Sequence, residues 1–76
     1  MSPTKMRAWP MKLVWVAEGG SVVAVVTVAD ENTARKLIGV THPSAMYYSG
    51  KDGVVHAVES RGEKIIPVAR IEPDES

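Results

Sequence analysis

The residues of this chain best suited to chemistry at neutral pH are its two histidines, His42 and His56. A transition-metal site built on histidine needs a third and a fourth ligand at short, regular spacings. The two histidines show no such spacing, and the chain has no cysteine to complete a site. We therefore expect no metal and no cofactor. His42 is interpreted as a turn residue before Pro43, and His56 as a residue on the face of a strand.

The remaining polar residues show no arrangement typical of an enzyme. Serines in the middle of the chain fall in turn-like settings, where the hydroxyl bonds to nearby backbone, and none lies in the order G-x-S-x-G. These serines are Ser21, Ser44, Ser49 and Ser60. Exposed positions at a hairpin end explain Glu59 and Glu63, and neither Gly19-Gly20 nor the turn at 50–53 has the lysine pattern of a phosphate loop. We therefore expect no enzymatic activity.

Basic residues gather near the start of the chain, with a tryptophan among them. Lys5, Arg7 and Lys12 give the first twelve residues a charge of +3 with no acid, and Trp9 lies between them. Such side chains can hold phosphates and stack a base. The chain as a whole has 9 basic and 9 acidic residues, however, and three charges release few counterions. Nucleic-acid binding through these four residues is therefore the alternative hypothesis, and otherwise Trp9 folds back on the edge of the domain.

Two adjacent tyrosines, Tyr47 and Tyr48, are candidate contacts for a protein partner. Neighbouring residues of a strand point to opposite faces, so one tyrosine should lie in the core and the other should be exposed. An exposed tyrosine beside a cation is typical of the anchors of protein interfaces. A half-buried tyrosine that closes the end of the core is the alternative. The candidate protein-binding residues are Tyr47, Tyr48, His42, Lys51, Arg35 and Lys36.

The composition favours a small domain built mainly of strands. Its 76 residues include 12 valines, 8 alanines and 4 isoleucines, but only 2 leucines and no phenylalanine. β-Branched side chains pack well on a pleated sheet and lose rotamer freedom in a helix. A core of this size has no disulfide to support it, so a dimer or a partner surface would add stability.

Three segments follow from the distribution of prolines, charges and apolar residues. Residues 1–10 are predicted to form an irregular basic arm with two prolines, and residues 72–76 an acidic tail. Residues 11–71 between them are predicted to form a single α+β domain.

The domain is predicted to start with a β-hairpin. Apolar residues alternate over Met11–Ala17, and Val22–Val28 forms a second run of strand-favouring residues. Between them, Gly19-Gly20 supplies the backbone freedom that a tight turn needs. Trp15 shares a face with Leu13 and is expected to lie in the core.

A short helix is predicted over residues 30–39. Asp30 is typical of an N-cap, because its carboxylate can accept hydrogen bonds from the free amides of the first turn. Gly39 is expected to end the helix. Apolar residues at i, i+3 and i+4 form one narrow stripe, which consists of Ala34, Leu37 and Ile38.

Three further strands are predicted at Met46–Tyr48, Val54–Glu59 and Lys64–Ile71. Pro67 places the last of these at an edge or at a bulge, because proline donates no ladder hydrogen bond. Short connections require antiparallel neighbours. The predicted fold is therefore α+β, an antiparallel sheet of four to five strands with one short helix, in the order β-β-α-β-β-β.

The strand Val22–Val28 is apolar on both faces. One short helix covers only one face of a sheet. We therefore expect this strand either to lie centrally beneath the helix with a partner on its far side, or to belong to a sheet that curls into a half-barrel.

The chain resembles small phage-encoded inhibitors of bacterial defence, such as anti-CRISPR proteins. The resemblance lies in its length, in its lack of cysteine and of catalytic motifs, and in its order of hairpin (Lys12–Val28), helix (Asp30–Gly39) and strands (Val54–Ile71). It covers architecture only, so no functional residue carries over. It implies stoichiometric blocking of a larger nucleoprotein complex. The neutral net charge departs from acidic, DNA-mimicking members and favours steric masking over phosphate mimicry.

The sequence therefore predicts a non-catalytic protein-binding module. Its expected partner is a larger protein or nucleoprotein complex, or a second copy of the chain as a homodimer. No apolar run approaches the roughly 18 residues that span a bilayer, and no apolar segment of a signal peptide follows Lys5 and Arg7. We expect a cytoplasmic protein without a membrane partner, in the host cytoplasm if it is encoded by a phage.

Overall fold

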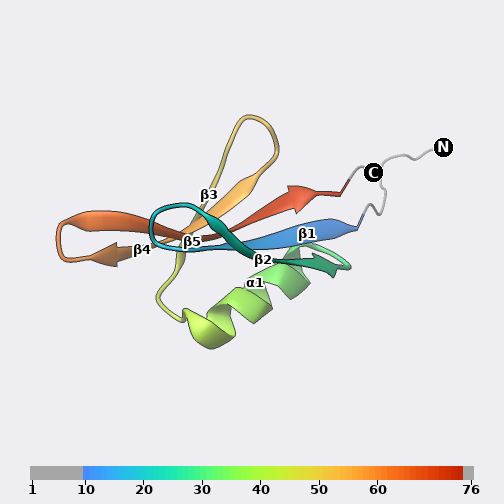
Figure 1. The fold of residues 1–76 in the computed structure, drawn as a ribbon. Helices are drawn as coiled ribbons and strands as arrows, with labels where there is room; N and C mark the ends of the chain where they lie inside the picture. Colours follow the sequence, from blue (N-terminus) through green and yellow to red (C-terminus); the bar gives the residue numbers. More distant parts are fainter. Residues whose placement is uncertain (1–9, 75–76) are drawn as a thin grey trace.

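One five-stranded antiparallel sheet and one helix make up the computed structural model, which describes residues 10–74 (Figure 1). The element order is β-β-α-β-β-β, so the predicted α+β fold class is confirmed. The elements are β1 (Met11–Val16), β2 (Val22–Val28), α1 (Glu31–Thr41), β3 (Met46–Ser49), β4 (Val55–Arg61) and β5 (Lys64–Pro73).

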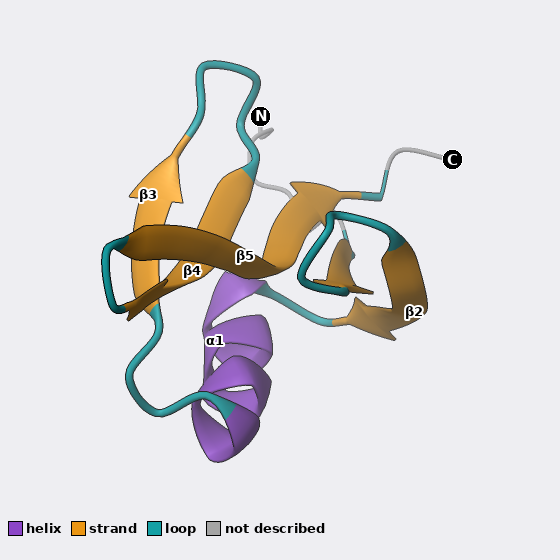
Figure 2. Ribbon diagram, turned by 60° about the vertical axis from the view of Figure 1, so that its left-hand side comes forward, coloured by secondary structure: helices purple, strands orange, loops and turns teal. Residues whose placement is uncertain are grey.

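The strands lie in the order β2-β1-β5-β4-β3, and α1 covers one face of the sheet (Figure 2). The hairpin β1–β2 and the meander β3–β4–β5 supply three of the four strand pairs. The contact between them is made by β1 and β5, which come from opposite ends of the described chain: Met11 lies opposite Pro73, and Leu13 opposite Ile71. The helix follows β2 at one edge of the sheet and leads to β3 at the other edge.

The core lies between α1 and the sheet. A row of side chains crosses this face, with Leu13 of β1 opposite Val26 of β2 on one side and Ile71 of β5 on the other. Ile71 is in turn opposite Val55 of β4. Leu13 and Ile71 are fully buried and pack with Ile38 of the helix. Apolar burial of this kind is the main favourable contribution to folding, so these rows hold the sheet and the helix together.

Helix α1 begins where the sequence predicts and ends later. Asp30 is its N-cap, and its carboxylate accepts a hydrogen bond of 2.8 Å from the Thr33 amide. The prediction that Gly39 ends the helix is wrong: the helix continues to Thr41, with His42 as its C-cap. Pro43 explains the true end, because the residue before a proline is pushed out of the helical conformation.

The apolar stripe of the helix is narrower than predicted. Ala34 and Ile38 are buried against the sheet, whereas Leu37 is 41% exposed. Successive helical residues are about 100° apart. Leu37 therefore lies to one side of the row that faces the sheet.

The N-cap gives the first testable prediction. Hydrogen bonds from Thr33, first from its amide and then from its hydroxyl, lower the pKa of Asp30. The ionised carboxylate is thus favoured in the folded state, and its contribution to stability is complete above the unfolded-state pKa of about 4 and is lost as the pH falls through the lower folded-state pKa. Asn caps a helix as well as Asp but has no charge to lose. We therefore expect Asp30→Asn to be nearly as stable as the wild type at pH 7 and the urea midpoint of the wild type to fall relative to that of Asp30→Asn as the pH falls below 4. A wild-type midpoint that rises relative to that of Asp30→Asn in acid would contradict this assignment.

The placement predicted for the valine-rich strand is wrong. β2 is not central, and its two faces are not both buried as in the predicted half-barrel: it forms an edge of the sheet, with β1 as its neighbour. The reason is the path of the chain, since β5 occupies the free side of β1 and the helix leaves β2 directly for the opposite edge. Among its residues, only Val28 is buried.

The second face of the sheet, away from α1, is partly polar. Lys12 and Arg70 both contact Glu72, with nitrogen–oxygen distances of 3.7 and 2.6 Å. Next to them, Arg70 lies opposite His56 on β4 and opposite the buried Val14 on β1. Ion pairs and water satisfy these charges, so this part of the face needs no apolar cover.

Pro67 lies at a bulge, as predicted. The register between β4 and β5 shifts after Ala57, so that Ala57 faces Ala69 whereas Val58 faces Pro67. Pairing with β1 extends only from Ala69 to Pro73, so the missing amide of Pro67 costs no bond to β1. The strand also continues to Pro73 instead of ending at Ile71 as predicted.

Candidate binding edge and groove

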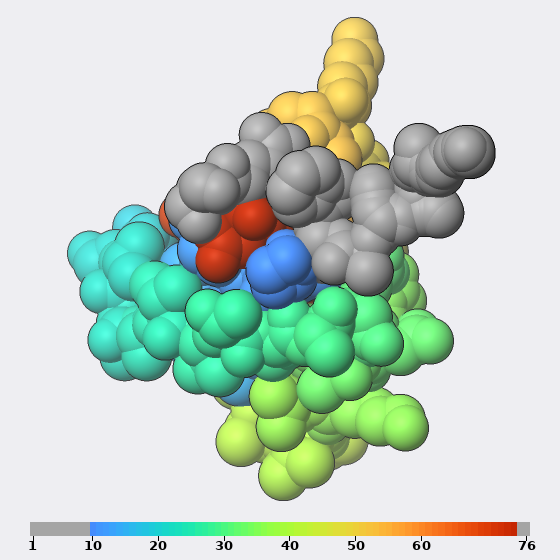
Figure 3. All heavy atoms as spheres, turned by 90° about the vertical axis from the view of Figure 1, so that its right-hand side faces the viewer, coloured from blue at the N-terminus to red at the C-terminus, as the bar shows by residue number. Residues whose placement is uncertain are grey.

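Strand β2, at the edge of the sheet, has four of the nine exposed large apolar side chains of the described chain. Its side chains remain accessible at Val22 (54%), Val23 (66%), Val25 (54%) and Val26 (40%). The whole strand has the sequence VVAVVTV and carries no charge and no proline. Figure 3 shows its atoms running across the surface, between those of β1 and those of α1. No strand in residues 10–74 pairs with this edge.

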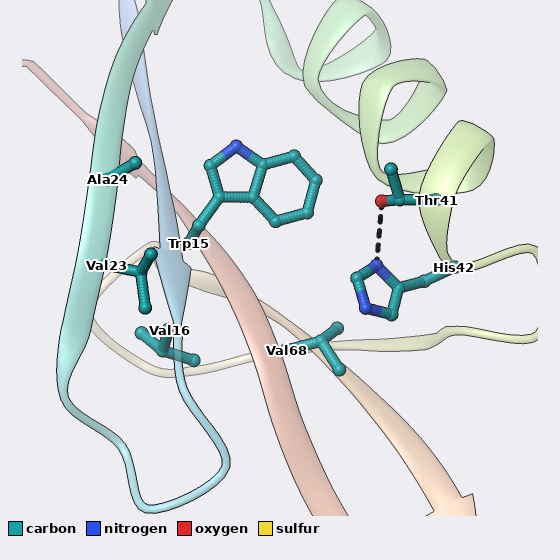
Figure 4. Close-up of a pocket in the computed structure, with 7 residues that line it drawn as sticks. All are labelled: Trp15, Val16, Val23, Ala24, Thr41, His42 and Val68. Atoms are coloured by element: carbon teal, nitrogen blue, oxygen red, sulfur yellow. Dashed lines mark hydrogen bonds between the residues drawn. The ribbon is translucent and has the colours of Figure 1, made fainter.

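A groove of about 410 Å³ lies beside β2, where the strand approaches the end of the helix (Figure 4). Most of its wall is apolar, and the two polar side chains come from the last residues of the helix and its cap. The lining residues are Trp15, Val16, Val23, Ala24, Thr41, His42 and Val68.

Both irregularities of the sheet contribute to this groove. The register between β1 and β2 shifts between Trp15 and Val16, which leaves Val23 as the extra residue on β2. The shift between β4 and β5 leaves Val68 as the extra residue on β5. A bulge re-aims the side chain of its extra residue. Val23 and Val68 therefore both line the groove, although their strands are not neighbours.

His42 is held in place at one side of the groove. The Thr41 hydroxyl donates to the Ile38 carbonyl oxygen at 3.3 Å and lies 2.8 Å from Nδ1 of His42. The imidazole lies 5.9 Å from the Trp15 ring, centroid to centroid, and its Nε2 side faces the groove (Figure 4). The groove thus offers a flat aromatic surface and one ring nitrogen, Nε2 of His42.

Two of the predicted contact residues meet on the helix side of the sheet. The Arg35 guanidinium lies 4.6 Å from the centre of the Tyr47 ring, and the Tyr47 hydroxyl donates to the Arg35 carbonyl oxygen at 3.4 Å. Arg35 also pairs with Glu31 at 2.7 Å. These contacts tie Tyr47 to the helix and the core. Lys36, next on the helix, is exposed.

The other predicted contact residues lie apart from that pair. Tyr48 is 55% exposed on the opposite face, so the prediction that the two tyrosines point to opposite sides is confirmed. Its ring stacks on His56 with centroids 4.9 Å apart, and not on His42. Lys51 lies in the turn between β3 and β4, whereas His42 lies in the groove. The structure therefore does not bring the six residues together on one surface.

The basic residues of the alternative hypothesis are only partly described. Lys12 lies on β1 and pairs with Glu72 on the face away from the helix. Lys5, Arg7 and Trp9 lie outside the described residues.

Within the part of the chain that the structure describes, no group of three or more His, Cys, Asp or Glu side chains could hold a metal ion. The helix in that part is not long and apolar enough to cross a membrane.

Sequence reasoning missed both the exposed edge and the groove. The groove depends on two bulges, and only Pro67 signals one of them in the sequence. The edge had a clearer signal. Valines on both faces are also typical of an edge strand that pairs with a strand of another chain.

Comparison with known proteins gives no relative. No protein-family model, no curated protein and no solved structure matches this chain. The geometry of β2 and the groove is therefore the basis for assigning a function.

Proposed function

We propose that this chain is a non-catalytic protein-binding module that receives an extended, uncharged segment of its partner as a sixth strand on β2. The observation that carries the proposal is the long edge of β2, which has exposed valines and no charge.

Edge strands in natural sheets are normally protected. Charged side chains, prolines, bulges and short length all prevent a strand edge from pairing with another chain. The second edge of this sheet, β3, has only four residues, whereas β2 has seven. The protection of β2 is limited to the bulge at Val23, near its beginning. The stretch from Ala24 to Val28 pairs regularly with β1 and keeps its outer side available.

The groove gives the added strand a way to be recognised. In strand addition, the main chain supplies hydrogen bonds and alternate side chains enter pockets that set specificity. The groove lies on the helix side of β2, and Val23 and Ala24 form the wall between it and the incoming strand. A long side chain of that strand on the α1 face would reach across the small Ala24 to pack against Trp15, and a polar group at its end would meet Nε2 of His42.

An inhibitor of a nucleoprotein defence complex, as the resemblance implies, would use the same edge. It would block its target by occupying a strand-binding position on a protein subunit. The neutral net charge and the uncharged edge favour this steric mode over phosphate mimicry.

The experiment compares three immobilised baits in a lysate of the native cell. Val25→Lys places an ammonium on the exposed edge, and Val40→Lys makes the same change at a residue of α1 that is 79% exposed. Desolvating an unpaired charge costs ~1–3 kcal/mol or more, so we expect Val25→Lys to reduce capture of the specific partner by about ten-fold or more. The wild type and Val40→Lys should capture it equally. Identical capture by all three baits would contradict the proposal.

A further inference from the structure

We infer that, when no partner is bound, β2 pairs antiparallel with β2 of a second copy about a two-fold axis at Val25. The inference rests on the proposed function, because the second copy would occupy the same edge. The product would be a continuous sheet containing the five strands of each copy.

The absence of charge on β2 allows this edge to pair with the same edge of a second copy. A two-fold interface brings each residue of a patch opposite a residue of the same patch, so a charged strand meets its own charge. Like charges directly opposite each other destabilise a strand pair. β2 contains valine, alanine and threonine only, and the net charge of the chain is zero. Neither local nor long-range repulsion therefore opposes the pairing.

The register follows from placing the middle residue of the strand on the axis. Ala24 then lies opposite Val26 of the second copy, and both belong to the stretch that pairs regularly with β1. Val25, 54% exposed in the single chain, would contact Val25 of the second copy. β-Branched side chains in direct opposition are favourable pairs in sheets.

The helix leaves room for a second copy. A two-fold axis perpendicular to the sheet places the helices of both copies on the same face. Figure 2 shows α1 on the inner side of β2, beneath the centre of the sheet, with β2 outermost. The two helices would thus lie on either side of the new interface without meeting at it.

Self-pairing would regulate the binding edge. One edge accepts one strand, so pairing with a second copy and pairing with a partner exclude each other. The partner would have to compete with the dimer, and apparent affinity for the partner would fall as the concentration of the chain rises.

The first test is the molar mass in solution. We expect the wild type, measured by light scattering over a range of concentrations, to approach twice the 8.2 kDa of one chain. Val25→Lys places two ammonium groups opposite each other on the axis and should remain at the mass of one chain. Val25→Thr, which keeps the branched shape, and Val40→Lys should dimerise like the wild type. Circular dichroism of each variant verifies that it is folded.

The second test fixes the register. The chain has no cysteine, so a single introduced thiol can form a disulfide only with a second copy. In the inferred register, Val25→Cys places the two thiols directly opposite each other, within the reach of a disulfide. Ala24→Cys places them on the diagonal, ~7–8 Å apart, which is too far. We expect mild oxidation to cross-link the first variant and not the second.

Three outcomes would overturn the inference: a wild type of one-chain mass at the highest attainable concentration, a Val25→Lys variant that still dimerises, or cross-linking of Ala24→Cys in preference to Val25→Cys. The proposed function fails separately. A monomeric wild type with capture that depends on Val25 refutes only the dimer, whereas a dimer without such capture refutes only the partner.

Discussion

Replacing Ile71 with alanine is expected to lower the free energy of unfolding by about 2–5 kcal/mol. Ile71 is fully buried on β5, between Leu13 of β1 and Val55 of β4. The alanine would leave a cavity at the junction of the two hairpins, where neighbouring side chains cannot all move in to fill it. A domain of this size has a total stability of only ~4–11 kcal/mol. Urea titration at neutral pH should therefore show a large fall in the midpoint, or a chain that is partly unfolded in water.

The same strand contains the matched control. Ile65 is also an isoleucine of β5, but its side chain is 62% exposed. Ile65→Ala removes the same atoms without leaving a buried cavity, so its unfolding free energy should change by about 0.5 kcal/mol or less. Equal losses in the two variants would show that Ile71 does not lie in the core.

Replacing Ile38 with alanine is expected to have the second large effect and to lower the free energy of unfolding by about 2–5 kcal/mol. Ile38 and Ala34 are the buried residues of α1, so Ile38 is the one large side chain that anchors the described helix to the sheet. A helix of 11 residues is marginal without tertiary packing. We therefore expect weaker helical circular dichroism as well as an earlier urea midpoint.

Leu37→Ala provides the comparison on the same helix. Leu37 precedes Ile38 in the chain and is 41% exposed, so shortening it removes less buried surface. The loss of unfolding free energy in Leu37→Ala should be well under half of the loss in Ile38→Ala. If the two variants lost equal stability, the helix would have to pack on the sheet through a different face from the one described.

Local features of this fold were predictable because their causes are local. Asp30 caps a helix through an amide three residues away, and the turn at Gly20 takes a φ of 97° that glycine alone adopts at little cost. The alternation that separates Tyr47 from Tyr48 is a property of any strand. Each of these features depends on at most a few consecutive residues.

The order of the strands was not predictable in the same way. It depends on which strand occupies the free side of β1, and β5, some sixty residues away, does so through Ile71 and Ala69. Nothing in the alternation of Val22–Val28 distinguishes a central strand from an edge. The groove was still harder to foresee, since Val23 and Val68 reach it only through register shifts in two different strand pairs.

The pairing of β1 with β5 has a consequence for how the chain is made. Met11 and Leu13 emerge from the ribosome some sixty residues before their partners Pro73 and Ile71. Until β5 has emerged, the sheet that the helix covers is incomplete. An isolated two-stranded hairpin has only marginal stability in water. The sheet should therefore form only once β5 has emerged, in an all-or-none step, and a ribosome stalled before β5 would release a product open to proteolysis over β1 to β4.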